Sequence, residues 1–142
     1  MVADRLSDGV RIAELLASEV TGNESRLRGL TVVDADPDAD ATTDGALAYR
    51  VAREAGDGDG VGPDDERAAG EPVAEVYVQP DRARIEAIAA PDAAATAARE
   101  SDLRVRPKAS RPPRTLVFVE DGAQVKRALA VLEAIREDPD AD

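Results

Sequence analysis

Five cationic side chains lie close together near the C-terminal end of the sequence, within residues 103–119, a stretch that contains no acidic residue. Guanidinium and ammonium groups bind carboxylates and phosphates, and arginine does so through two parallel hydrogen bonds. Prolines at positions 107, 112 and 113 stiffen the same stretch and favour an extended backbone. The pattern predicts a surface that binds a negatively charged group through Arg104, Arg106, Lys108, Arg111 and Arg114.

Three kinds of partner fit this basic segment. The arginines can face carboxylates of the same molecule, an interface with a partner protein or a second copy, or an anion such as a nucleotide or nucleic acid. The acidic composition, considered below, predicts a cytoplasm with multimolar salt, where the Debye length is below about 3 Å. For five phosphate contacts on duplex DNA, the logarithm of the binding constant falls with the logarithm of the salt concentration with a slope of about −4.5. The segment also lacks interleaved aromatic residues for base stacking. We therefore favour intramolecular or protein-interface contacts over nucleic acid.

A second group of charged residues consists of four aspartates that alternate between positions 34 and 40. Aspartates at this spacing occur in calcium-binding loops, which also need glycine at the sixth position and glutamate at the twelfth. Counted from the first aspartate, these positions hold Ala39 and Gly45. We expect no resident metal and no cofactor, and the candidate ligands for a metal would be Asp34, Asp36, Asp38 and Asp40.

The absence of histidine and cysteine excludes several classes of chemistry. Nucleophilic catalysis by Ser–His or Cys–His pairs is excluded, as are the usual zinc and iron–sulfur sites. A carboxylate-dependent hydrolase stays open, because thirty Asp and Glu residues allow many pairs. With no recognisable catalytic motif, we predict a non-catalytic binding or interaction protein. Binding of an anion, nucleotide or nucleic acid is the alternative, and the hydrolase comes third.

The overall composition describes the solvent around the protein. Thirty acidic residues stand against 18 basic ones, which gives a formal net charge of −12. Carboxylates hold water and cations tightly and keep a protein soluble where salt would otherwise drive association. The first residues carry an acid where a signal peptide would be apolar, and the longest strongly apolar run is only Leu116 to Val119. These features predict a halophilic, acidic protein of the cytoplasm that makes no membrane contact.

Hydrophobic periodicity predicts three helices and six strands. Residues 46–53 are compatible with a strand or a helix, and we prefer the strand. Strands 73–78 and 82–89 form an antiparallel hairpin, because apolar and charged residues alternate on both sides of a Gln-Pro-Asp turn. The predicted helices span 6–20, 92–101 and 123–136, and the predicted strands span 30–35, 46–53, 73–78, 82–89, 103–106 and 115–119.

The order α-β-β-β-β-α-β-β-α predicts an α+β fold in two layers. An antiparallel-rich sheet of about five to six strands would carry helices on one face. We expect a single domain over residues 1–136, with a flexible acidic loop inserted at 56–72 and a disordered acidic tail at 137–142. Strand 115–119 is continuously apolar and is expected to be central, with both faces covered.

Three stretches of the sequence carry a resemblance. They are the opening Asp-Arg-Leu-Ser-Asp-Gly-Val-Arg-Ile-Ala-Glu-Leu-Leu-Ala-Ser-Glu, residues 76–78 with 81–84, and the motif Leu-Arg-Val-Arg-Pro-Lys at 103–108 running into Arg-Pro-Pro-Arg-Thr-Leu-Val-Phe-Val-Glu at 111–120. In these stretches the chain resembles a family of uncharacterised haloarchaeal proteins. The likeness covers most of the chain outside residues 56–72. The resemblance implies a domain of unknown function in a salty cytoplasm and assigns no chemistry to any residue.

Overall fold

The computed structural model describes residues 8–22, 27–36, 38–54 and 69–137 of the chain. Within them the chain forms three α-helices and six β-strands in the predicted order α-β-β-β-β-α-β-β-α. These elements are α1 (Gly9–Gly22), β1 (Leu30–Val33), β2 (Ala46–Glu54), β3 (Ala69–Gln79), β4 (Arg82–Ala87), α2 (Pro91–Glu100), β5 (Arg104–Lys108), β6 (Arg114–Val119) and α3 (Gly122–Glu137).

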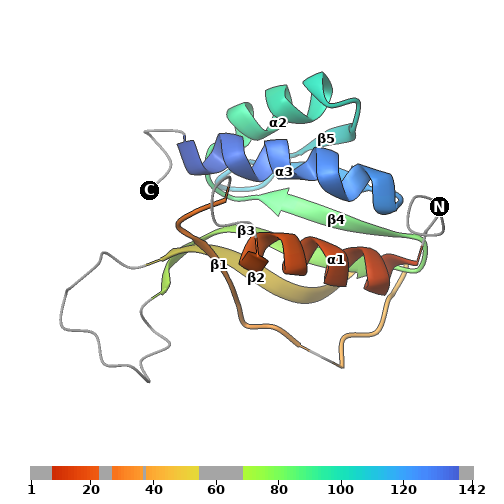
Figure 1. Cartoon of the computed structure of the whole chain (residues 1–142). Coiled ribbons are helices and arrows are strands. Elements are labelled where there is room, and N and C mark those ends of the chain that lie inside the picture. The colour runs from red at the N-terminus through yellow and green to blue at the C-terminus, as the bar shows by residue number, and fades with distance from the viewer. Residues whose placement is uncertain (1–7, 23–26, 37, 55–68, 138–142) are drawn as a thin grey trace, which may run out of the picture.

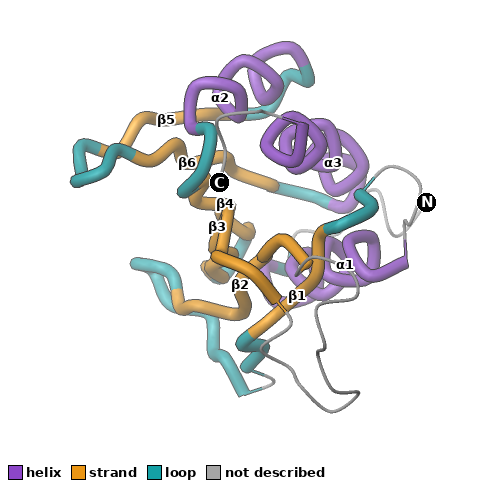
Figure 2. The backbone as a smooth tube through the Cα atoms, turned by 90° about the vertical axis from the view of Figure 1, so that its left-hand side faces the viewer, coloured by secondary structure: helices purple, strands orange, loops and turns teal. Residues whose placement is uncertain are grey.

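The six strands form one antiparallel sheet in the order β1-β2-β3-β4-β6-β5. After β4 the chain runs through α2, returns as the edge strand β5, and then turns back to place β6 between β5 and β4. The three helices lie on one side of the curved sheet, with α3 between α1 and α2 (Figure 1, Figure 2). The α+β fold with helices on one face is therefore confirmed.

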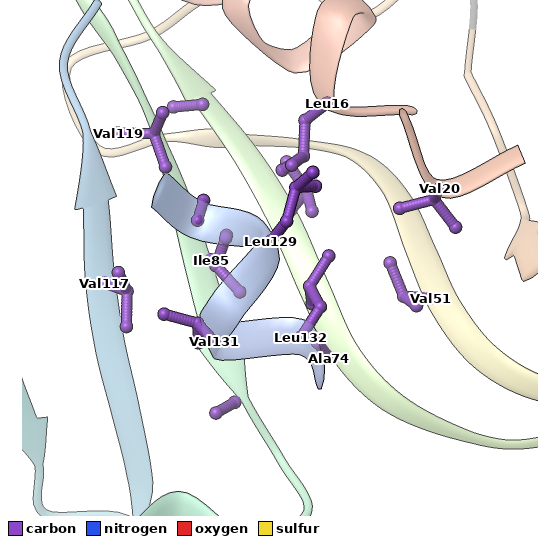
Figure 3. Packing of buried hydrophobic residues seen from close by; sticks show 14 of the residues in the cluster. Leu16, Val20, Val51, Ala74, Ile85, Val117, Val119, Leu129, Val131 and Leu132 are labelled. Carbon is purple, nitrogen blue, oxygen red and sulfur yellow. The ribbon is translucent and has the colours of Figure 1, made fainter. Parts of the chain in front are cut away.

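The hydrophobic core fills the space between the helices and the sheet. Alternation along the strands sends one set of side chains toward the helices, and Val76, Ile85 and Val117 stand opposite one another in a buried row. Figure 3 shows Leu129 and Leu132 of α3 among these strand side chains. Large aromatic residues contribute little to this core, so packing depends on many small and branched side chains.

Helix α1 starts against the turn between β3 and β4. The Asp8 carboxylate accepts hydrogen bonds from the backbone amides of Val10 (3.0 Å) and Arg11 (3.3 Å), and thereby caps the helix. Gly9 follows this cap and is buried against the turn, where a Cβ atom would collide with the carbonyl oxygens of Gln79 and Arg82. Only glycine allows the two backbones to approach so closely.

Several predicted boundaries differ from the structure. Strand β3 begins at Ala69, so residues 69–72 are strand rather than loop, and residues 56–68 of the expected loop lie outside the described residues. Helix α3 continues to Glu137, and the remaining residues of the expected tail, 138–142, also lie outside the described residues. The prediction placed the loop boundary by composition, whereas pairing with β2 extends β3.

Two predictions about the C-terminal strands were wrong. Strand β5 does not end before Pro107 but runs through it to Lys108. Proline is tolerated there because β5 is an edge strand, where a missing backbone N–H need not break the ladder. Strand β6 is not covered on both faces. Its burial alternates, with Thr115, Val117 and Val119 buried and the residues between them only half-buried.

Candidate functional site

The face of the sheet that points away from the helices carries most of the charged strand residues. We call it the open face. Residues directly opposite each other in antiparallel strands share a face, so the strand register defines its rows. One row contains Arg50, Glu75, Glu86, Leu116 and Arg106, and the next contains Tyr77, Arg84, Phe118 and Arg104.

Two glutamates occupy the centre of the open face and are buried despite their charge. Glu86 is 1% exposed and Glu75 is 8% exposed. Arg114 joins them, because its Nη1 atom donates to Glu75 Oε1 at 2.8 Å and to Glu86 Oε1 at 3.0 Å. A buried carboxylate is costly unless it is paired and hydrogen-bonded. The arginine therefore bridges the two buried carboxylates.

Further donors surround each glutamate. Glu86 accepts from Arg84 Nε at 3.0 Å and from Lys108 Nζ at 3.3 Å. Glu75 accepts from Arg50 Nε at 2.9 Å and from the Tyr77 hydroxyl at 2.8 Å. Both carboxylates thus have cationic donors on several sides. We call the two glutamates together with Arg50, Tyr77, Arg84, Lys108 and Arg114 the charge network.

Arg84 is held in place from more than one direction. Its guanidinium lies over the Tyr77 ring, with Cζ 4.7 Å from the ring centroid, and Nη1 donates to the Asp44 carbonyl at 3.1 Å. Gly45, which has a positive φ of 94°, leaves room for this side chain, since a Cβ atom there would lie 2.9 Å from the Arg84 guanidinium nitrogens. The stacked arginine is thus held in position by contacts within the chain.

The network fixes the charge state of Glu75. Burial raises the pKa of this carboxyl, but hydrogen bonds from Tyr77, Arg50 and Arg114 outweigh it and leave the pKa below its usual range. Burial lowers the pKa of Arg114, and its bonds to the two glutamates more than compensate, so that the guanidinium stays charged. A general acid needs a raised carboxyl pKa. The lowered pKa of Glu75 suits a structural or binding role better than proton donation.

The structure divides the predicted basic segment. Lys108 and Arg114 belong to the charge network, while Arg104 Nε lies 3.5 Å from Glu120 Oε2. Arg106 is exposed on the open face, and Arg111 is exposed in the connection between β5 and β6. Neither has an ion pair or side-chain hydrogen bond within the part of the chain that the structure describes. Four of the five predicted cations therefore share one face, and Arg111 lies at its end.

Sequence reasoning did not select the other members of the charge network. Alternation along 82–89 places Arg84 and Glu86 on the face opposite the apolar residues, but it does not show that Glu86 is buried there. Arg50 and Glu75 were not singled out. The available signal was the repetition of charged residues on one face of consecutive strands. Only the strand order shows that these charges meet the basic segment.

The four aspartates proposed as metal ligands do not converge. Asp34 Oδ2 pairs with Arg50 Nη1 at 3.0 Å, and Asp36 Oδ1 accepts a hydrogen bond from the backbone amide of Asp38 at 2.9 Å. Within the described residues, no group of three or more acidic side chains is close enough to hold a metal ion. Asp34, which follows β1, instead pairs with Arg50 of the charge network.

The comparison with protein families bears on the whole chain, because one family model matches residues 1–142. The chain belongs to the DUF7993 family. This is a family of unknown function, in agreement with the expectation of an unassigned domain, and the match says nothing about a haloarchaeal origin. No curated protein and no solved structure matches the chain. Chemistry must therefore be argued from the residues themselves.

The open face as a whole has an excess of positive charge. Seven cations lie on this face of strands β2 to β6, and within the described residues five acidic side chains pair with six of them, namely Glu75, Glu86, Asp34, Asp81 and Glu120. Half-buried Leu116 and Phe118 lie between these charges on β6. The seven cations are Arg50, Arg82, Arg84, Arg104, Arg106, Lys108 and Arg114.

None of the described helices is long and apolar enough to cross a membrane.

Proposed function

We propose that this is a non-catalytic binding protein of a salt-rich cytoplasm, and that its open face binds an acidic surface on a partner protein. The observation that carries the proposal is the local excess of cations in a chain whose formal net charge is −12. An arbitrary distribution of charge would make this face acidic. A concentrated patch of opposite sign steers and orients a negatively charged partner.

The partner would contact the cations that the fold leaves unpaired. Arg114, Arg84 and Arg50 already neutralise Glu75 and Glu86, so they mainly shape the surface. Arg106 and Arg111 remain exposed, and no other side chain within the described residues binds them. Guanidinium groups form bidentate bonds with carboxylates, so these two arginines are suited to pair with Asp or Glu side chains of a partner.

Apolar side chains favour a protein partner over nucleic acid. Leu116 and Phe118 are half-buried beside the cations, and protein interfaces combine apolar and aromatic residues with arginine. Binding to single-stranded nucleic acid requires aromatic rings on which bases stack. One side of the Tyr77 ring is already covered by Arg84. In concentrated salt, contacts that exclude water also survive better than bare charge attraction.

A charge-reversal experiment tests this proposal. Tagged wild-type protein, the Arg106→Glu/Arg111→Glu variant and a control Arg99→Glu/Arg127→Glu variant are purified from the native host in multimolar KCl. Arg99 on α2 and Arg127 on α3 are exposed outside the open face, so the control has the same change in charge. Retained proteins are quantified by mass spectrometry, and self-association is measured by sedimentation equilibrium.

We expect a stoichiometric protein with the wild type and the control, and at least a tenfold loss with the open-face variant. A tenfold loss corresponds to about 1.4 kcal/mol of binding free energy. Equal retention by the two variants would contradict the proposal. Co-purification of nucleic acid in place of a protein, lost only in the Arg106→Glu/Arg111→Glu variant, would assign the same arginines to an anion site instead.

A further inference from the structure

A cavity of about 350 Å³ lies on the helix side of the sheet, between α1, β1, β2 and the connection from β1 to β2. This volume falls within the range of small-molecule sites, which are mostly apolar with a few placed polar groups. Residues of α1 and of this connection line it together. The lining includes Val10, Ala13 and Ala17 of α1, Val32 of β1, Ala39 of the connection and Tyr49 of β2.

The inner part of the cavity is apolar. Tyr49 is only 4% exposed, and its hydroxyl donates to the Ala13 carbonyl at 2.7 Å. Burial raises the pKa of that hydroxyl, so the phenol stays neutral. Since the hydroxyl already has a partner in α1, the tyrosine offers its ring rather than a free polar group. Small side chains leave the space unfilled, and an apolar ligand would regain the missing dispersion contacts.

The charged residues of the lining are both acidic. Glu14 of α1 and Asp36 of the connection are exposed and are the two ionisable carboxylates that border the cavity. Arg11 lies 3.1 Å from Glu14, but both side chains are more than half exposed and such pairs are weak in water. Among the described residues, the Asp36 carboxylate accepts a hydrogen bond only from the Asp38 amide, and Asp38 adds a further exposed negative charge.

We propose that this cavity binds a small molecule with an apolar body and a cationic head, of the aryl- or alkylammonium class. The apolar body would lie against the Tyr49 ring and the valine and alanine side chains. The ammonium group would stay at the mouth, between Glu14 and Asp36. The charge complementarity is opposite to that of the open face, so the two proposals concern separate surfaces and do not depend on each other.

The test compares two probes of similar size and opposite charge. 2-Phenylethylammonium and 3-phenylpropanoate are titrated into the full chain at one fixed KCl concentration, and valine methyl resonances are followed by NMR. We expect saturable shifts of the Val10 and Val32 methyls with the ammonium probe, and at least tenfold weaker binding of the carboxylate. Absence of saturable shifts up to the solubility limit, or equal binding of the two probes, would overturn the proposal.

Variants separate the cavity from general surface binding. Ala17→Leu places a larger side chain in the cavity and is expected to abolish the shifts, whereas Ala97→Leu on α2, half-buried outside the cavity, is the matched control. Ala39→Leu fills the cavity from the connection instead and serves if Ala17→Leu does not fold. Glu14→Gln/Asp36→Asn is expected to remove the preference for the ammonium probe. Unchanged binding in folded cavity-filling variants would also overturn the proposal.

Discussion

The two faces of the sheet bury their central residues by different physical means. On the helix face Ile85 is completely buried among apolar side chains of strands and helices. On the open face the neighbouring residue, Glu86, is 1% exposed and is buried among cations. The same strand thus gains apolar contacts on one side and ion pairs on the other. Two residues that are equally buried can therefore be stabilised by different interactions, here apolar contacts for Ile85 and ion pairs for Glu86.

This difference determines how each face responds to its surroundings. Apolar burial is non-directional and depends little on salt or pH. Ion pairs depend on partner geometry, on ionisation and on screening by salt. We therefore expect substitutions on the helix face to lower stability at every salt concentration, and substitutions in the charge network to have effects that vary with conditions. Four experiments sharpen or break this comparison.

The largest effect is expected from removing a core side chain of α3. Leu132 is fully buried against the sheet, so Leu132→Ala removes apolar contacts and leaves a cavity. The free energy of unfolding should fall by about 2–5 kcal/mol. Urea denaturation at two KCl concentrations measures this loss, which should be the same in both. A loss below about 1 kcal/mol would mean that α3 packs more loosely than described.

The next effect concerns the centre of the open face. Glu86→Gln removes the charge that pairs with Arg84, Lys108 and Arg114. Breaking a fully buried pair costs about 3–5 kcal/mol, and we expect about 2 kcal/mol here because the Lys108 side chain is 45% exposed. Glu14→Gln, at an exposed ion pair, is the control and should change stability by less than about 0.5 kcal/mol. Equal effects would break the comparison.

The third experiment uses the lowered pKa of Glu75. A carboxyl whose pKa is lower in the folded than in the unfolded state stabilises the fold above its ordinary pKa of about 4.3, and this contribution is lost as pH falls through the folded pKa. Wild-type stability should therefore decrease below about pH 4.3 more steeply than that of Glu75→Gln. Urea titrations between neutral and acidic pH compare the slopes. Identical slopes would contradict the role of the network.

The last experiment compares the two kinds of arginine on the open face and includes the smallest effects that we expect. Arg114→Gln removes the bridge between two buried glutamates and should cost about 1–3 kcal/mol. Arg106→Gln and Arg111→Gln remove exposed groups and should each change stability by less than about 0.5 kcal/mol. Thermal melts of the three variants are enough to test this order. A reversed order would contradict the bridging role of Arg114.

Much of the fold could be predicted because it rests on local patterns. The hairpin of β3 and β4 follows from alternation on both sides of a short turn, and it pairs as expected. Asp121 directly precedes α3, and its carboxylate caps the helix by accepting the Gln124 amide at 2.9 Å. The strand assignment of residues 46–53 was also confirmed. The hairpin and the helix cap depend on interactions between residues close in sequence, and β2 shows itself by its local pattern although its partners are more distant.

Only the basic segment of the candidate site could be predicted from the sequence, because the interactions that build the site join residues far apart in the chain. The basic segment stands out by composition, but its partners do not. Arg114 bonds to Glu75 and Glu86, which are 39 and 28 residues away in the sequence. Nothing local shows that β6 rather than β5 pairs with β4. That pairing decides which cations form ion pairs with the glutamates and which remain exposed.

The amino-acid sequence by itself determined the acidic character, the order of helices and strands, and the alternation that gives each strand two faces. The tertiary structure alone decided that Glu75 and Glu86 share one arginine, that Arg106 and Arg111 are left without partners within the described residues, and that small side chains of α1 and β2 line an open cavity. The physical reason is the distance in sequence between the residues that interact. Periodicity reflects contacts a few residues apart, whereas charge pairing and cavities arise only when strand order and register bring distant residues together.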